Sequence, residues 1–288
     1  MKKIYILLFV GSLMAGCNKF DEDINTNPNL PSQASGAQLI ANAELSLPAL
    51  SSVPAGEFHA QYLAETQYPG ASLYPAGSTS FYGLYQGPLM NLQTVLNSST
   101  LSGAEGPIAN QLAVARILKA YYIWHITDRW GDVPYSEALK GSENFKPKYD
   151  TQEAIYDSLF KSLDEAVAMM VPGNISSSDI IYGGDINKWR RFANSIHMLM
   201  ALRLSEVNAT KASAEFNKAL ARGIMTSNAD NFVFKHLSDA ANQSYWYGQV
   251  VVQNREWWAL TETLVDYMNP ASDPRLPVVV RSSLSRCR

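Results

Sequence analysis

With 288 residues, of which 47% are hydrophobic, the chain is long enough to bury a substantial core, which argues against intrinsic disorder. Its formal net charge of −3 and the lack of a basic stripe argue against a nucleic-acid partner. The only two cysteines, Cys17 and Cys287, exclude a disulfide framework and a cysteine-rich metal cluster.

The first seventeen residues have the pattern of a bacterial lipoprotein signal peptide. Two lysines at positions 2–3 precede an apolar run over 4–14 that is too short to span a bilayer. The sequence LMAGC at 13–17 resembles a lipobox, the site at which a signal peptidase cuts before a lipidated cysteine. We therefore predict a signal peptide over 1–16 and a lipid anchor, such as palmitate, on Cys17.

A short tether is predicted to follow the anchor, over 17–31. It contains the acidic run Asp21-Glu22-Asp23 and then a stretch rich in proline and asparagine with little apolar content. The acidic run is similar to the export signal of Bacteroidetes lipoproteins that reach the outer face of the outer membrane. The alternative is a solvated linker that happens to be acidic.

From residue 32 to residue 280 the chain is predicted to form a mainly α domain, because apolar residues recur at three- and four-residue steps. The first long helix has one apolar stripe, which consists of Ile108, Leu112, Ala115, Leu118, Tyr122 and Ile126. A second helix is expected to begin at Asp150 as its cap, with Glu153 three residues later, and to end at Pro172-Gly173.

A third helix is predicted after the turn Gly183-Gly184-Asp185. Its inward positions are expected to be Trp189, Phe192, Ile196, Leu199 and Leu202. A fourth helix is expected over 212–222, ending at Gly223. Strand-like alternation is scarce before 232–234. Successive paired helices indicate a helical-hairpin scaffold, although no fixed repeat period is present.

The stretch DRWGDVPYSEAL at 128–139 has the densest group of polar and aromatic side chains. In an enzyme, Asp128 and Asp132, or one of them with Glu137, would form a carboxylate pair for acid-base work on a glycosidic bond. The glycine and proline within the stretch break the helical spacing that would fix the distance between these carboxylates. We favour a structural role, in a turn that joins two scaffold helices, for Asp128, Trp130, Gly131, Asp132, Pro134 and Tyr135.

The same stretch resembles the signature of the SusD/RagB family, the glycan- and nutrient-binding lipoproteins of the Bacteroidetes outer membrane. Further motifs of this family follow in the expected order, namely PKYD at 147–150, GDINKW at 184–189, FANS at 192–195 and DPRL at 273–276. Together with the lipobox, the motifs extend from Cys17 to about residue 277. Within them, structural roles are also predicted for Asp185, Trp189 and Asn194.

The resemblance implies a helical fold built around tetratricopeptide-like hairpins, with loop-rich insertions, and a binding protein without catalysis or a cofactor. It also implies that the lipoprotein binds on top of a SusC-like TonB-dependent transporter, to which it delivers an oligosaccharide or peptide. Family members normally continue well beyond the DPRL segment, whereas here an atypical polar tail over 281–288 follows soon after it. The resemblance therefore leads us to expect a truncated or frameshifted member.

The family motifs identify no ligand-binding residue, so the ligand site is predicted from chemistry alone. Sugar rings stack on exposed aromatic faces, while polar side chains contact the hydroxyl groups. Two aromatic-rich loops, 62–85 and 242–258, offer such faces, and the predicted platform comprises Tyr74, Tyr82, Tyr245, Trp246 and Trp258. For each of these residues, burial in the core is the alternative.

No metal site is predicted, because the four histidines lie far apart without a carboxylate at ligand spacing. The favoured function is capture of carbohydrate nutrients by a lipid-anchored protein of the outer membrane that faces the cell exterior, as part of polysaccharide utilisation. The runner-up is a helical-repeat scaffold that binds only protein partners or peptides. A glycosidase is a distant third possibility.

Overall fold

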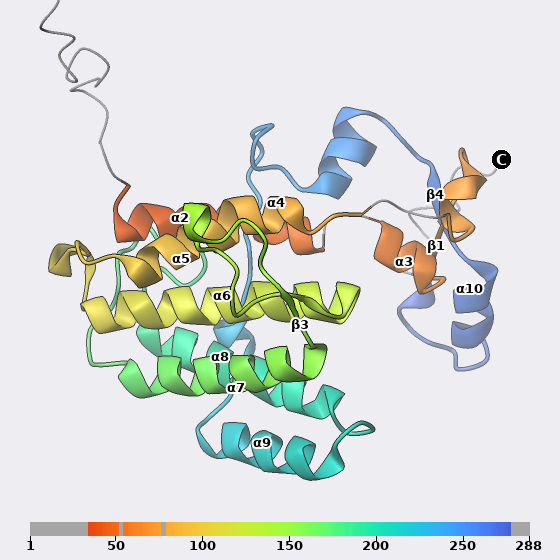
Figure 1. Cartoon of the computed structure of the whole chain (residues 1–288). Helices are drawn as coiled ribbons and strands as arrows, with labels where there is room; N and C mark the ends of the chain where they lie inside the picture. The colour runs from red at the N-terminus through yellow and green to blue at the C-terminus, as the bar shows by residue number, and fades with distance from the viewer. Residues whose placement is uncertain (1–33, 52–53, 76–78, 278–288) are drawn as a thin grey trace, which may run out of the picture. The chain divides into compact units, whose positions relative to one another are not determined.

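The computed structural model of the chain describes residues 34–51, 54–75 and 79–277 (Figure 1). The predicted signal peptide, the anchor Cys17, the tether and the 281–288 tail lie outside the described residues. Within the described ranges, every helix is too short or too polar to cross a membrane.

Helices dominate the described part of the chain, which confirms the predicted mainly α class. The α-helices are α2 Gly36–Leu45, α3 Ala55–His59, α4 Tyr82–Leu84, α5 Met90–Asn97, α6 Ile108–Trp130, α7 Gln152–Met169, α8 Ile186–Arg203, α9 Ala209–Ala221 and α10 Glu262–Met268. The strands are β1 Leu63–Glu65, β2 Val133–Pro134, β3 Tyr149–Asp150 and β4 Trp258–Leu260. Short 3-10 segments are η2 Leu47–Leu50, η3 Pro69–Ser72, η5 Gly103–Glu105, η6 Gly141–Glu143 and η7 Asn228–Asp230, and π-helical segments are η4 Tyr85–Leu89 and η8 Tyr247–Val252.

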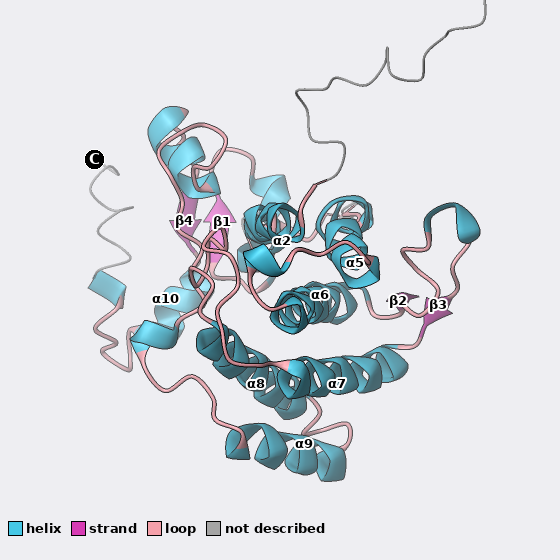
Figure 2. Cartoon of the chain, turned by 90° about the vertical axis from the view of Figure 1, so that its left-hand side faces the viewer, coloured by secondary structure: helices cyan, strands magenta, loops and turns pink. Residues whose placement is uncertain are grey.

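Helix α6 lies at the centre of the helical layers. It packs against α2 and α5 on one side and against α7 and α8 on the other (Figure 2). Its side chains are therefore buried around most of its circumference, including Val114, Ile117 and Tyr122, whose exposed fraction is 0%. The single apolar stripe predicted for this helix is too narrow a description, and Ile108, at its first turn, is exposed.

Two antiparallel helical hairpins, α6 with α7 and α8 with α9, make up the scaffold (Figure 1). The prediction that Asp150 caps α7 is wrong, because the Thr151 side chain accepts the hydrogen bond from the backbone amide of Ala154. Asp150 instead accepts hydrogen bonds from the backbone amides of Tyr135 and Ser136, at 3.1 and 2.7 Å. Its side chain thus fixes the loop before α7 and not the helix itself.

The buried face of α8 differs from the predicted one near the end of the helix. Trp189, Phe192 and Ile196 are buried as expected, whereas Leu199 and Leu202 are 44% and 55% exposed. At about 100° per residue, position 202 lies roughly 140° around the helix axis from Trp189, so the two side chains face different sides. Met200 takes the inward position instead.

The aromatic segment 232–234 does not form a strand. A strand needs a backbone partner, and here Phe232 stacks on Phe192 of α8, with ring centroids 4.0 Å apart and planes inclined by 4°. The longer of the two small sheets is elsewhere, where β1 pairs antiparallel with β4, with Leu63 opposite Leu260 and Glu65 opposite Trp258. This pairing joins segments that are nearly 200 residues apart.

Candidate ligand-binding site

The end of α6 leads into a turn that connects it to α7. Gly131 adopts φ +73°, a left-handed conformation that favours glycine, and its carbonyl accepts a hydrogen bond from Thr127 Oγ1 at 2.7 Å. Asp132 Oδ1 accepts from the backbone amide of Gln152, the first residue of α7, at 2.9 Å. The hydroxyl of Tyr85 donates to the carbonyl of Pro134, so the turn is also tied to η4.

The carboxylate of Asp128 connects three helices. Its Oδ1 accepts a hydrogen bond from the Tyr156 hydroxyl of α7 at 2.5 Å, and its Oδ2 lies 3.0 Å from Nε of Arg203 on α8. The Trp124 indole donates to the same Tyr156 hydroxyl at 3.1 Å. Burial, followed by the hydrogen bond to Asp128, raises the pKa of Tyr156, so this hydroxyl remains a donor.

The three acids of the 128–139 stretch have separate partners. Asp128 is engaged by Tyr156, and Asp132 by the amide of Gln152. Glu137 accepts a hydrogen bond from the backbone amide of Lys148 at 3.3 Å, which holds the pKa of its carboxyl below the usual range. A general acid of a glycosidase needs a raised pKa, so Glu137 is a poor candidate for that role.

Three further motif residues fix the second hairpin. Asp185 caps α8 by accepting hydrogen bonds from the amides of the two residues at 187 and 188, at 2.9 and 3.3 Å. The indole of the fully buried Trp189 donates to Asp179 Oδ2 at 2.7 Å. Asn194 Nδ2 donates to the carbonyl of Gly223 at 2.8 Å, which holds the end of α9 against α8.

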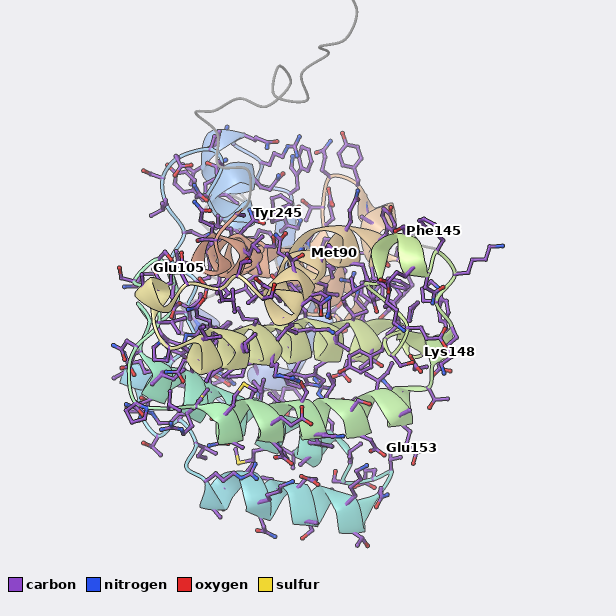
Figure 3. The ribbon with its side chains drawn as sticks, turned by 60° about the vertical axis from the view of Figure 1, so that its left-hand side comes forward. Met90, Glu105, Phe145, Lys148, Glu153 and Tyr245 are labelled. Carbon is purple, nitrogen blue, oxygen red and sulfur yellow. The ribbon has the colours of Figure 1, made fainter. Side chains whose placement is uncertain are left out.

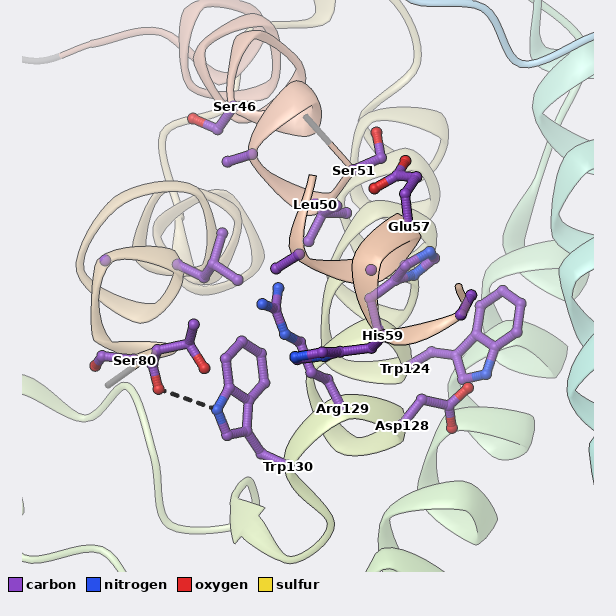
Figure 4. A pocket seen from close by; sticks show the side chains of 18 of the residues that line it. Ser46, Leu50, Ser51, Glu57, His59, Ser80, Trp124, Asp128, Arg129 and Trp130 are labelled. Atoms are coloured by element: carbon purple, nitrogen blue, oxygen red, sulfur yellow. Dashed lines mark hydrogen bonds between the residues drawn. The ribbon is translucent and has the colours of Figure 1, made fainter. Parts of the chain in front are cut away.

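A cavity of about 1000 Å³ opens beside the end of α6. We refer to it as the central cavity (Figure 4). Residues from η2, α3, the 79–88 segment and α6 line it, together with Arg203 of α8. Its chemically informative lining residues are Glu57, His59, Tyr62, Trp124, Asp128, Arg129, Trp130 and Arg203. Its volume lies in the range that small-molecule ligands occupy.

Trp130 forms an aromatic wall of the central cavity. Its indole Nε1 donates to the carbonyl of Thr79 at 3.2 Å, and Phe81 packs edge-to-face on its ring with centroids 5.6 Å apart. The guanidinium of Arg129 lies over the same indole, 4.7 Å from the ring centroid. The sequence predicts a structural role for Trp130, and the structure adds that Trp130 lines the central cavity.

A second aromatic feature lies around the β1–β4 sheet, and we refer to it as the aromatic cluster. Its members are Tyr68, Tyr245, Trp246, Trp257 and Trp258. Edge-to-face contacts connect Tyr68 with Trp257 at 5.3 Å, Trp246 with Trp258 at 5.2 Å, and Tyr245 with Trp246 at 5.3 Å between centroids. The cluster therefore brings together three of the five predicted platform residues with two others.

The aromatic cluster is partly accessible and has a cation at its edge. Tyr68 is 59% exposed, and the rings at 245, 246, 257 and 258 are partly buried. The guanidinium of Arg255 lies 4.5 Å from the ring centroid of Trp257, and its Nη1 donates to Gln249 Oε1 at 2.6 Å. Such a mixture of aromatic faces and polar groups suits recognition of a sugar.

Tyr74 and Tyr82, the other two predicted platform residues, lie outside this cluster. Tyr74 is 56% exposed and stacks on the ring of His59, with centroids 5.6 Å apart and planes inclined by 9°. Tyr82 is 67% exposed at the start of α4, and the next two residues line the central cavity. Both tyrosines therefore neighbour elements of the central cavity, and ligand binding by any of the five residues stays a prediction.

Residues 28–286 match the model of a SusD-like family described as starch-binding and associating with the outer membrane. The comparison with curated proteins gives no match.

Solved structures give the same assignment. A chitin-binding protein is 27% identical, with a TM-score of 0.70, and the match covers 84% of this chain and 54% of that protein. A SusD-like protein from Bacteroidetes is 27% identical, with a TM-score of 0.68 and coverage of 85% and 50%. A SusD homolog from Bacteroides fragilis NCTC 9343 is 26% identical, with a TM-score of 0.69 and coverage of 85% and 52%. The chain thus spans about half the length of the solved structures it matches.

Proposed function

Because the chain belongs to the SusD-like family, which is described as starch-binding and associating with the outer membrane, we propose that it captures oligosaccharides at the cell surface. Members of this family are binding proteins and not enzymes, so the proposed activity is capture without bond cleavage. The similar chitin-binding protein supports a carbohydrate as the ligand.

The aromatic cluster is the observation that carries the proposal. Pyranose rings have apolar faces that pack on aromatic side chains, and their hydroxyl groups need polar partners. Trp246 and Trp258, held at 5.2 Å by an edge-to-face contact, present rings in a fixed arrangement, and Tyr68 extends the surface toward solvent. Arg255, whose guanidinium lies 4.5 Å from the Trp257 ring, and its hydrogen-bond partner Gln249 offer polar groups at the edge of the cluster.

Tyr74 and Tyr82 are proposed to extend the binding surface toward a longer ligand. Both tyrosine side chains are more than half exposed, so their rings can contact a sugar without a change in the fold. Tyr74 is also oriented by His59, because its ring is stacked on the imidazole and its hydroxyl donates to the His59 carbonyl at 3.4 Å.

Delivery and anchoring complete the proposed function. The lipidated Cys17 would hold the protein on the outer membrane, facing the exterior, and a SusC-like TonB-dependent transporter would receive the ligand. Three experiments test this proposal. Palmitate labelling that is lost in Cys17→Ser tests the anchor, protease accessibility on intact cells tests the orientation, and co-purification tests the association with the transporter. Labelling that persists in Cys17→Ser would argue against lipidation of Cys17. Protection from protease on intact cells would argue against exposure to the exterior, and absence of the transporter from the purified protein would argue against their association.

Isothermal calorimetry with the Cys17→Ser chain and a panel of malto-oligosaccharides, chito-oligosaccharides and peptides tests the binding itself. Trp246→Ala and Tyr68→Ala are expected to lower affinity for the bound oligosaccharide by at least about tenfold, or ~1.4 kcal/mol. Phe145→Ala is the matched control, because Phe145 is 81% exposed in the loop between β2 and β3, outside the aromatic cluster and the central cavity (Figure 3).

The panel also separates the alternatives. Saturable binding of an oligosaccharide without release of reducing ends supports the proposal. Binding of peptides only would favour the protein-binding scaffold, and release of reducing ends would favour a glycosidase. Unchanged oligosaccharide affinity in both Trp246→Ala and Tyr68→Ala would show that the binding site does not lie at the aromatic cluster.

A further inference from the structure

The central cavity contains an arginine whose charge is not neutralised within the described part of the chain. Arg203 is engaged by Asp128, with Nε and Oδ2 3.0 Å apart. Arg129, by contrast, has no carboxylate within 4.0 Å among the described residues, and its guanidinium lies over the Trp130 ring. The guanidinium of Arg129 is therefore available to an anion that enters the cavity.

The Trp130 ring orients this guanidinium through a cation–π contact. Trp130, over which it lies at 4.7 Å, is held by its hydrogen bond to Thr79 and by the ring of Phe81. In Figure 4 the Arg129 side chain extends between Trp130 and His59, into the space that the lining residues enclose. A pre-oriented guanidinium loses less conformational freedom when it binds an anion.

The competing carboxylate of Glu57 faces another part of the cavity. In Figure 4 it points toward Ser51 and away from Arg129. Glu57 and Ser51 can therefore contact hydroxyl groups of a ligand without pairing with the guanidinium. Aromatic side chains complete the walls, since Trp124, Trp130 and Tyr62 also line the cavity.

We propose that the central cavity is a second carbohydrate site, which binds an acidic oligosaccharide by pairing the carboxylate of a uronic-acid residue with Arg129. A guanidinium matches a carboxylate through two parallel N–H···O hydrogen bonds, and the indole beside it provides a face for the sugar ring. The volume of about 1000 Å³ accommodates several sugar units rather than a small free carboxylate. The ligand class rests on the proposed function, but the site shares no lining residue with the aromatic cluster.

A helix-stabilising role is the structural alternative for Arg129, because it lies in the last turn of α6, where a cation interacts favourably with the helix dipole. Lysine satisfies that role equally well but cannot form the paired hydrogen bonds of a guanidinium. Arg129→Lys and Arg129→Gln therefore separate recognition from stability.

Calorimetry of the Cys17→Ser chain with trigalacturonic acid and with its fully methyl-esterified form tests the proposal. The acid is expected to bind at least about tenfold more tightly than the ester, and this preference should shrink as sodium chloride is added. Arg129→Gln should lower affinity for the acid by about tenfold and Arg129→Lys by a smaller factor. Arg129→Lys should keep the wild-type melting temperature, because it retains the positive charge in the last turn of α6. Arg190→Gln, at a partly exposed arginine on α8 outside the cavity, is the matched control.

Equal affinity for acid and ester, undetectable binding of the acid, or wild-type affinity for the acid in Arg129→Gln would each overturn the proposal. Trp246→Ala separates binding in the central cavity from binding at the aromatic cluster. It should leave binding of trigalacturonic acid unchanged while it lowers affinity for a neutral oligosaccharide. Loss of both in Trp246→Ala would show that one site, the aromatic cluster, serves both ligands.

Discussion

The hydroxyl of Tyr156 donates to Asp128 Oδ1 at 2.5 Å, across the hairpin formed by α6 and α7. Tyr156 is only 5% exposed, whereas the side chain of Arg203, the other partner of Asp128, is 60% exposed. Water screens an exposed ion pair, so the hydrogen bond is expected to contribute more to stability than the ion pair.

Tyr156→Phe should therefore lower the free energy of unfolding by about 1.5–3 kcal/mol, the usual contribution of a hydrogen bond to a charged group. It also removes the acceptor of the Trp124 indole. Arg203→Gln should cost less than about 1 kcal/mol. Urea unfolding followed by circular dichroism measures both values, and a larger loss in Arg203→Gln would show that the ion pair is the principal link.

Asp132→Ala should destabilise the protein without weakening ligand binding. Asp132 accepts from the backbone amide of Gln152, which has no acceptor within α7 because it is in the first turn. Loss of such a cap costs about 1 kcal/mol. Asp132→Asn keeps an acceptor oxygen and should therefore retain most of the stability that Asp132→Ala loses. Thermal unfolding and calorimetry with the bound oligosaccharide measure the two effects, and an affinity loss at unchanged stability would assign Asp132 to a ligand site.

Local patterns allowed most of the scaffold to be predicted. Gly131 marks the end of α6, Pro172-Gly173 follows the end of α7, and Asp185 marks the start of α8. Exposed fractions were less predictable, because Leu199 and Leu202 continue a plausible three-residue spacing but drift to the outer side of α8.

Contacts between distant segments were not predictable from one sequence. The pairing of Glu65 with Trp258 brings Tyr68 beside Trp257, yet neither segment has a strong strand pattern. His197 likewise acquires carboxylate partners, Glu215 at 2.8 Å and Asp164 at 3.6 Å, from two other helices. The candidate site depends on such contacts, so the sequence predicted its residue types but not its arrangement.

Glu44 should make stability depend on pH. Its side chain is fully buried in α2, Oε2 accepts from the amide of Ile180 at 2.9 Å, and Oε1 has no hydrogen-bond partner among the described residues. Burial, followed by the negative charge of Asp179, raises the pKa of Glu44 from 4.5 to about 9. Glu44 is therefore neutral in the folded protein at pH 7 but ionised in the unfolded chain.

A carboxyl whose pKa is raised by folding stabilises the protein fully below its unfolded pKa, and this contribution is lost as pH rises toward the folded pKa. From about pH 5 to 9, Glu44 should lower the free energy of unfolding by up to ~1.4 kcal/mol per pH unit. Glu44→Gln cannot ionise, so its stability should fall less steeply over this range. Urea unfolding at several pH values compares the slopes, and identical slopes would mean that Glu44 does not remain protonated on folding.

Gly183 and Gly184 form a matched pair for testing the turn before α8. Both have positive φ, +61° and +89°, but an added Cβ at Gly183 meets open space, whereas at Gly184 it collides with the carbonyl of Ile175. Gly184 also donates its amide to Asp179 Oδ2 at 2.9 Å and accepts from the amide of Ile175 at 3.1 Å, so its backbone has little room to shift.

Gly183→Ala should therefore cost about 1–2 kcal/mol, the conformational cost of a left-handed residue alone. Gly184→Ala should cost at least about 1 kcal/mol more, because the close approach adds to the backbone strain and threatens two buried hydrogen bonds. Chemical denaturation of the two variants isolates this difference, since the substitution and the chain neighbourhood are the same. Equal losses would mean that the 175–176 segment moves aside freely, and that the turn before α8 requires glycine at position 184 only for its φ angle.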